Sequence, residues 1–76
     1  MTPMESCALR LITLRREAAA RYARIHRLWL AARNAYRRLH QEPVQNLLDL
    51  RNAALRLEQL ERGRAARLSD LKALSD

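Results

Sequence analysis

Apolar residues recur every seven positions along the first half of the chain. One column consists of Leu11, Ala18, Ile25, Ala32 and Leu39, and a second, four residues on, consists of Tyr22, Trp29 and Tyr36. A flanking set consists of Leu14, Leu28 and Ala35, with Arg21 as an interruption. Adjacent apolar columns at heptad spacing are typical of a helix that packs in a coiled-coil seam. We therefore expect one long helix with a wide apolar stripe.

The two ends of this helix have local sequence signals. Thr2 suits the N-cap, Pro3 suits the first helical position, and Glu5 completes a capping box three residues after the cap. No proline or glycine follows until Pro43, which pushes the residue before it out of the helical conformation. The first helix is therefore expected over about residues 3–41.

A narrower apolar stripe continues through the second half of the chain. Its members are Leu47, Leu50, Ala54, Leu57, Leu68 and Leu71, and it is widened by Leu48, Leu55, Leu60 and Leu74. Because Pro43 also suits the first position of a helix, we expect a tight turn at 41–43 and a second helix over about 43–74.

Two features complicate the second helix. Gly63 lies in its middle, and an isolated glycine costs about 1 kcal/mol relative to alanine without necessarily ending a helix. We favour a continuous helix; the alternative is a break at Gly63 and a short third helix from about residue 65. Glu61 and Arg64 also place charge where the stripe predicts apolar residues, and such positions fix register or meet a partner's opposite charge.

Two long helices joined by a short turn form an antiparallel hairpin, so we expect a single all-α domain over residues 1–76. A hairpin offers one contact face per helix, and we expect the aromatic column to extend beyond it. The stripes would then be covered by dimerisation into a four-helix bundle or by another protein's helices. The residues expected to contact the partner are Leu11, Tyr22, Ile25, Trp29, Tyr36 and Leu39.

Composition argues against other ways to stabilise a chain of 76 residues. Cys7 is the only cysteine, which excludes an internal disulfide and fits a reducing, cytoplasmic setting. Neither Cys7 nor the two histidines, His26 and His40, has the spacing of a zinc site, so we expect surface histidines and no metal or cofactor. No apolar run is long enough to span a membrane. No phosphate loop or local nucleophile–base pair is present, which predicts a non-enzymatic protein.

The net charge of +7 lies in the first half of the chain. Residues 1–41 hold nine arginines against two glutamates, whereas basic and acidic residues balance over 42–76. Four arginines lie roughly opposite the apolar stripe and could contact phosphates: Arg16, Arg24, Arg27 and Arg38. The alternative function is therefore a nucleic-acid-binding homodimer, with the four-helix-bundle architecture of small plasmid RNA-binding proteins. Arginine-rich coding explains the same composition without a ligand, and the shallow, alanine-rich stripe disfavours binding to a membrane surface.

The turn and second helix resemble a known family. Glu42-Pro43-Val44-Gln45, followed by LLDLRNAALRLEQL, is similar to the turn and second helix of the small co-chaperones of bacterial type III secretion. That family forms antiparallel helical hairpins of similar length. Each hairpin pairs with a larger tetratricopeptide-like chaperone, and together they hold the needle subunit before export. The longer, more basic first helix and Trp29 depart from the family pattern. The resemblance implies that the apolar columns of the first helix form the docking face.

Overall fold

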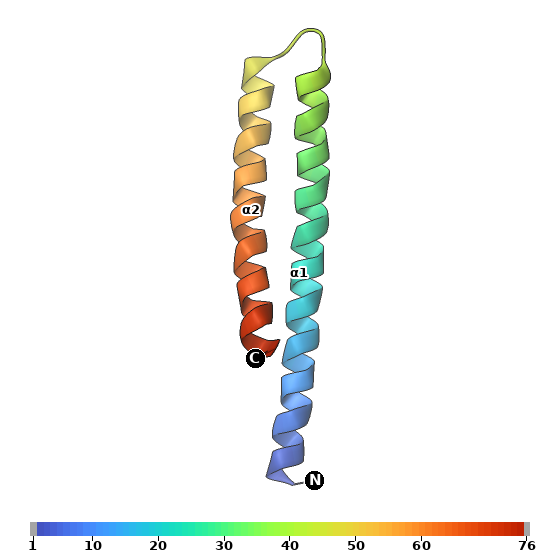
Figure 1. Ribbon diagram of the computed structural model, residues 1–76, viewed down its shortest axis with the longest axis vertical. Coiled ribbons are helices and arrows are strands. Elements are labelled where there is room, and N and C mark those ends of the chain that lie inside the picture. Colours follow the sequence, from blue (N-terminus) through green and yellow to red (C-terminus); the bar gives the residue numbers. More distant parts are fainter. Residues whose placement is uncertain (1, 76) are drawn as a thin grey trace.

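The computed structural model describes residues 2–75 and is an all-α hairpin of two antiparallel helices (Figure 1). Helix α1 comprises Pro3–Gln41 and helix α2 comprises Leu47–Ser75. The chain forms a rod of 65 × 15 × 14 Å, in which α1 continues well past the end of α2 (Figure 1). The fold class predicted from the periodicity is therefore confirmed.

Both predicted ends of α1 are confirmed. Thr2 Oγ1 accepts a hydrogen bond from the Glu5 backbone N–H, and Glu5 Oε2 accepts one from the Thr2 N–H, each at 3.2 Å. This capping box satisfies two donors that the first turn would otherwise leave unpaired. At the other end, Glu42 is extended, with φ −68° and ψ 140°, as expected for a residue before proline.

The predicted turn at 41–43 and the predicted start of the second helix at residue 43 are wrong. The helix begins at Leu47, because Asn46 Oδ1 accepts hydrogen bonds from the backbone N–H groups of Leu48 and Asp49, at 3.0 and 3.3 Å. Gln45 Nε2 donates to the His40 carbonyl at 2.8 Å and so completes the end of α1. Two side-chain caps therefore define a loop over residues 42–46, within which Pro43 begins no helix.

Helix α2 runs without a break through Gly63, so the expected continuity is confirmed and the short third helix does not form. Gly63 is half-buried and faces α1. A methyl group at this position would lie 3.4 Å from Ile25 Cδ1 and 3.6 Å from Ile25 Cγ1, which is ordinary van der Waals contact. The glycine thus leaves a small gap in the seam, and the backbone there is normally helical.

The hairpin has a thin core. Among the described residues, the buried apolar side chains are those of Ala18 and Leu60, at 3% and 7% exposure. The other stripe residues are mostly half-buried, as expected for helices that touch along one face: Ile25, Ala32, Leu39, Leu50, Ala54, Leu57, Leu68 and Leu71. Leu47 was expected in the stripe but is 78% exposed, because it opens the first turn of α2 beside the loop.

The elongated shape leaves a large surface. The chain exposes 6209 Å², whereas a compact folded protein of 8.9 kDa exposes about 4,800 Å² by the usual scaling with mass. Large apolar side chains contribute to this excess at both ends of the rod and on its flank, and they include Met4, Leu9, Ile12, Leu14, Leu28, Leu48 and Leu55. A two-helix layer of this length therefore buries too little apolar surface to be strongly stable alone.

Candidate functional site

The middle of the seam contains a cluster of aromatic and cationic side chains. Tyr22, His26 and Trp29 stack along α1, with ring centroids 5.6 and 5.7 Å apart. Arg64 reaches this stack from α2. Its Nε donates a hydrogen bond to His26 Nδ1 at 2.9 Å, and its guanidinium carbon lies 4.4 Å from the centroid of the Trp29 ring. The charge that interrupts the second stripe is thus accommodated within the chain by a cation–π contact and a hydrogen bond.

This cluster changes the interpretation of the aromatic column. Tyr22 and Trp29 are half-buried, with Arg64 of α2 5.9 Å from the Tyr22 ring centroid and Arg33 of α1 5.0 Å from the Trp29 ring centroid. Trp29 Nε1 is buried and has no hydrogen-bond partner among residues 2–75. These side chains therefore belong to the internal seam, and their contact with a partner stays a prediction.

The two histidines have different surroundings. His26 is half-buried, because it lies between the rings of Tyr22 and Trp29 and accepts a hydrogen bond from Arg64. The prediction that His26 lies on the surface is therefore wrong. His40 is exposed, as expected. Its ring centroid lies 4.5 Å from that of Tyr36, and the two rings meet edge to face.

The other residues predicted to contact a partner lie in three settings. Ile25 and Leu39 are half-buried in the seam, and Tyr36 is half-buried beside His40. Leu11 is 37% exposed and lies in the N-terminal part of α1, one turn before Arg15. Near the end of α2, Arg15 Nε donates a hydrogen bond to the Leu74 carbonyl at 2.6 Å.

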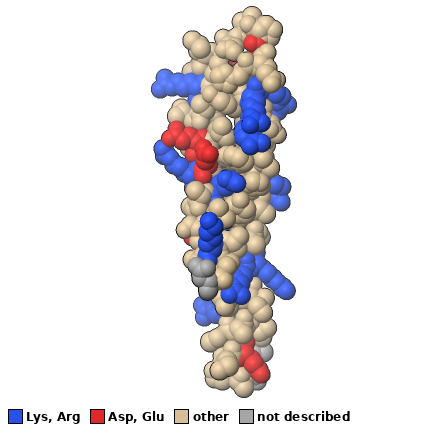
Figure 2. Space-filling model, in the orientation of Figure 1, with Lys and Arg blue, Asp and Glu red and all other residues tan. Residues whose placement is uncertain are grey.

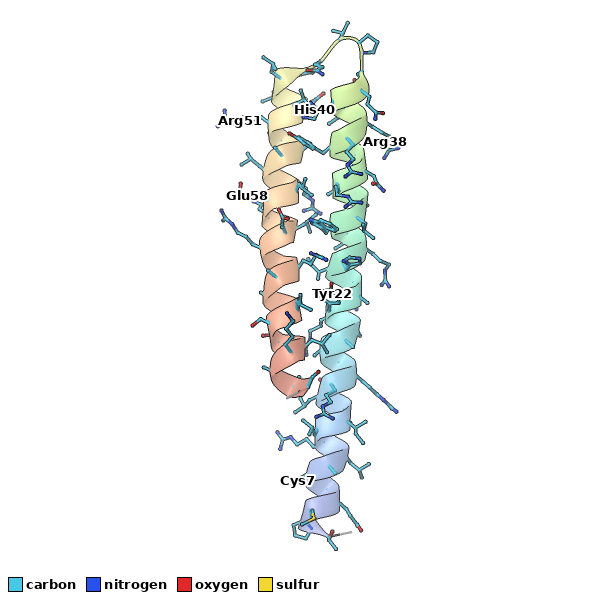
Figure 3. All side chains as sticks on the ribbon, viewed as in Figure 1. Cys7, Tyr22, Arg38, His40, Arg51 and Glu58 are labelled. Carbon is cyan, nitrogen blue, oxygen red and sulfur yellow. The ribbon has the colours of Figure 1, made fainter. Side chains whose placement is uncertain are left out.

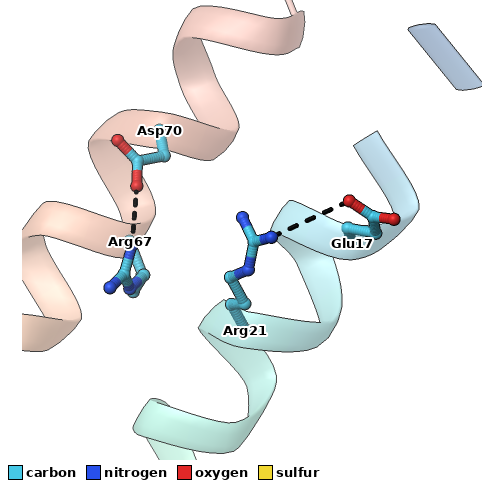
Figure 4. A network of polar contacts seen from close by, with 4 residues as sticks. All are labelled: Glu17, Arg21, Arg67 and Asp70. Atoms are coloured by element: carbon cyan, nitrogen blue, oxygen red, sulfur yellow. Dashed lines mark hydrogen bonds and ion pairs between the residues drawn. The ribbon is translucent and has the colours of Figure 1, made fainter. Parts of the chain in front are cut away.

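A groove of about 310 Å³ opens on one flank of the hairpin, and its lining consists of Arg21, Arg24, Ile25, Leu28 and Arg67. Figure 4 shows Arg21 of α1 and Arg67 of α2, each directed toward a carboxylate of its own helix. Arg21 pairs with Glu17 at 3.7 Å, and Arg67 pairs with Asp70 at 3.2 Å. Both pairs are about half exposed, so each contributes little to stability and can exchange its partner.

The groove belongs to a longer strip of the α1 surface. Leu14 and Leu28 lie two heptads apart on one column and are 40% and 46% exposed. The neighbouring column consists of Arg10, Glu17, Arg24, Ala31 and Arg38, all exposed. We call these two columns the leucine–arginine flank. An apolar column beside a charged column is the arrangement by which a coiled-coil helix selects a further helix.

The four arginines predicted to contact phosphate are all exposed. Arg24 and Arg38 lie on one heptad column of the flank, and Arg38 points away from α2 in Figure 3. Arg16 and Arg27 lie on two other columns, so the four do not converge on one patch. Figure 2 shows Lys and Arg side chains spread over the length of the visible face.

No group of three or more potential metal ligands occurs within residues 2–75, and no helix in that range is long and apolar enough to cross a membrane. Comparison with known proteins finds no family model, no curated protein and no solved structure that matches this chain.

Proposed function

We propose that this chain is a non-enzymatic protein–protein interaction module, a small adaptor or co-chaperone that binds a partner protein through an apolar face of its helices. The observation that supports this proposal best is the apolar surface left uncovered. The hairpin exposes about 1,400 Å² more than a compact protein of its mass, and leucines occupy part of that surface. Covering the apolar part of that surface would be favourable.

The excess is larger than the area that one partner would cover. A specific interface of standard size buries about 800 Å² on each protein. Covering that area would add stability to a hairpin whose buried apolar residues include little more than Ala18 and Leu60. Folding and partner binding are therefore coupled in this proposal, as they are for many small helical subunits. A cytoplasmic co-chaperone of type III secretion, paired with a larger helical chaperone or its client, is the specific form that the sequence resemblance suggests.

Affinity capture from a host lysate tests the proposal. The tagged full chain is incubated with nuclease-treated lysate, washed at 0.5 M salt, and its partners are identified and quantified by mass spectrometry. We expect one protein in roughly stoichiometric amount. Leu60→Asp places a charge in the core and should abolish capture, whereas Gln59→Asp, at the exposed polar position beside it, should not. Recovery of the chain alone, or equal capture by both variants, would refute the proposal.

The alternative, a nucleic-acid-binding homodimer, is favoured by one observation: all four predicted phosphate-contacting arginines are exposed. If this function is correct, replacing Arg24, Arg27 and Arg38 together by glutamine should reduce the dependence of binding on salt concentration, because fewer counterions are released from the nucleic acid. An unchanged salt dependence in electrophoretic mobility shifts would mean that these three arginines contact no phosphate.

A further inference from the structure

We propose that the leucine–arginine flank docks an acidic amphipathic helix of the partner protein, which lies alongside the hairpin as a third helix. This inference rests on the proposed function and names the surface and the chemistry of its occupant. It follows from the groove between Leu28 and Arg67, from the exposed leucine column, and from the arginine column beside it.

The apolar part of the site fits a helix. Leu28 and Ile25 line the groove, and Leu14 continues the same surface toward the extended end of α1. Leu14 and Leu28 are fourteen positions apart, or about 21 Å at the helical rise of 1.5 Å per residue. A partner helix of roughly four turns therefore reaches both leucines with a heptad-spaced apolar stripe, in the manner of helix-in-groove recognition.

The charged part of the site sets the sign of the partner. Arg24 lines the groove and makes no ion pair within residues 2–75, whereas Arg21 and Arg67 are held only by exposed pairs with carboxylates of their own helices. Arg10 and Arg38 extend the same column in both directions. Glutamates or aspartates along one edge of the partner's apolar stripe would therefore meet Arg10, Arg24 and Arg38, while Glu17, the acidic member of this column, is paired with Arg21.

This charge distribution disfavours a second copy of the chain as the occupant. A second copy would present to these arginines either its own leucine–arginine flank or a surface of residues 42–76, where basic and acidic residues balance and no net negative charge is available. Nucleic acid would match the positive charge but would leave Leu14 and Leu28 without a favourable contact, because a phosphate backbone does not bind aliphatic side chains. An acidic helix satisfies both features of the flank.

The test uses two labelled synthetic peptides of 28 residues, each with leucine at the seam positions of a heptad repeat. One carries glutamate and the other lysine at the flanking positions. Binding to the full-length chain is measured by fluorescence anisotropy at 0.15 M salt, where attraction between distant charges is largely screened. We expect the glutamate peptide to bind and the lysine peptide to bind at least a hundredfold more weakly.

Two matched pairs of variants locate the binding. Arg24→Glu should weaken binding of the glutamate peptide at least tenfold, whereas Arg27→Glu makes the same charge change on another column and should alter it less than threefold. Leu28→Ala should weaken binding about fivefold, whereas Leu55→Ala, with 48% exposure against 46% for Leu28, should leave it unchanged. Circular dichroism spectra of the four variants check that each remains helical.

Several outcomes would overturn the proposal. If Arg24→Glu and Arg27→Glu weaken peptide binding equally, the peptide is attracted by the overall positive charge and not by the flank. If Leu28→Ala leaves peptide binding unchanged, the peptide does not occupy the groove. If sedimentation detects a dimer and the Leu28→Ala substitution dissociates it, the flank binds a second copy of the chain. If the chain binds single-stranded RNA and this binding requires Arg24 but not Leu28, the flank binds phosphate groups. If a host protein is captured equally by wild type and by the Arg24→Glu/Leu28→Ala double variant, the proposed function stands and this inference fails.

Discussion

Replacing Gly63 by alanine should stabilise the hairpin. Alanine is favoured over glycine by about 0.8–1 kcal/mol in a helix interior. The added methyl group would meet Ile25 Cδ1 at 3.4 Å and Cγ1 at 3.6 Å, and contacts of this kind contribute about 0.1–0.2 kcal/mol each. The backbone at residue 63 is normally helical, so no strain offsets the gain. We expect the free energy of unfolding to rise by about 1–1.5 kcal/mol.

The effect can be measured by urea unfolding followed at 222 nm, at two protein concentrations so that any self-association is detected. For a domain of this size, the change corresponds to a rise in Tm of roughly 4–8 °C per kcal/mol. Ala65→Gly is the control: Ala65 is an exposed neighbour, and the change should lower the free energy of unfolding by about 1 kcal/mol through helix propensity alone. If Gly63→Ala destabilises the chain while the control behaves normally, the added methyl group must lie closer than 3.4 Å to the Ile25 side chain, and the packing described above is wrong.

Three further substitutions test other parts of the hairpin. Arg64→Met should lower the free energy of unfolding by about 2 kcal/mol, because it removes two ring contacts and leaves His26 Nδ1 without its donor. In the same urea titration, Arg62→Met, at a side chain that is 77% exposed, should change the free energy of unfolding by less than about 0.5 kcal/mol. Equal effects of the two substitutions would contradict the contacts described for Arg64. Asn46→Ala should cost about 1 kcal/mol through loss of the α2 cap and Asn46→Ser should restore it, and identical Tm values for all three proteins would show that the cap is not formed. Thr2→Ala should speed amide exchange in the first turn of α1 without a measurable change in Tm, because that turn lies beyond α2; a lower Tm would mean that it makes tertiary contacts.

The ends of the helices could be predicted where one local signal acts alone. Thr2 and Glu5 cap α1 through neighbouring side chains, and the proline after Glu42 ends it by a steric clash, so the sequence contains all the necessary chemistry. At the start of α2 two local signals compete. Pro43 suits a first helical position, but Asn46 supplies two hydrogen bonds to backbone donors that would otherwise lack partners, and this energetic difference decides the boundary.

The contacts between helices were less accessible from the sequence. The leucine column that contains Leu14 and Leu28 is visible as a heptad pattern, and so is the charge at Arg64. Which side chain of α1 meets Arg64, and whether Arg67 closes the groove beside Leu28, depends on how far one helix is shifted along the other. The periodicity of a single helix does not determine that shift, so the position of His26 was predicted wrongly and the groove was missed.

The order in which the two helices meet along the chain has a mechanical consequence. Three hydrogen bonds across or beside the seam join residues 5, 38 and 59 positions apart: Gln45 with His40, Arg64 with His26, and Arg15 with Leu74. Contacts near the loop close the shortest segments of chain and so require the least loss of entropy. We therefore expect the hairpin to form from its loop toward its termini and to open in the reverse order. We expect force applied to the two ends to separate the helices progressively from the termini, with the Arg64 cluster as the point of greatest resistance.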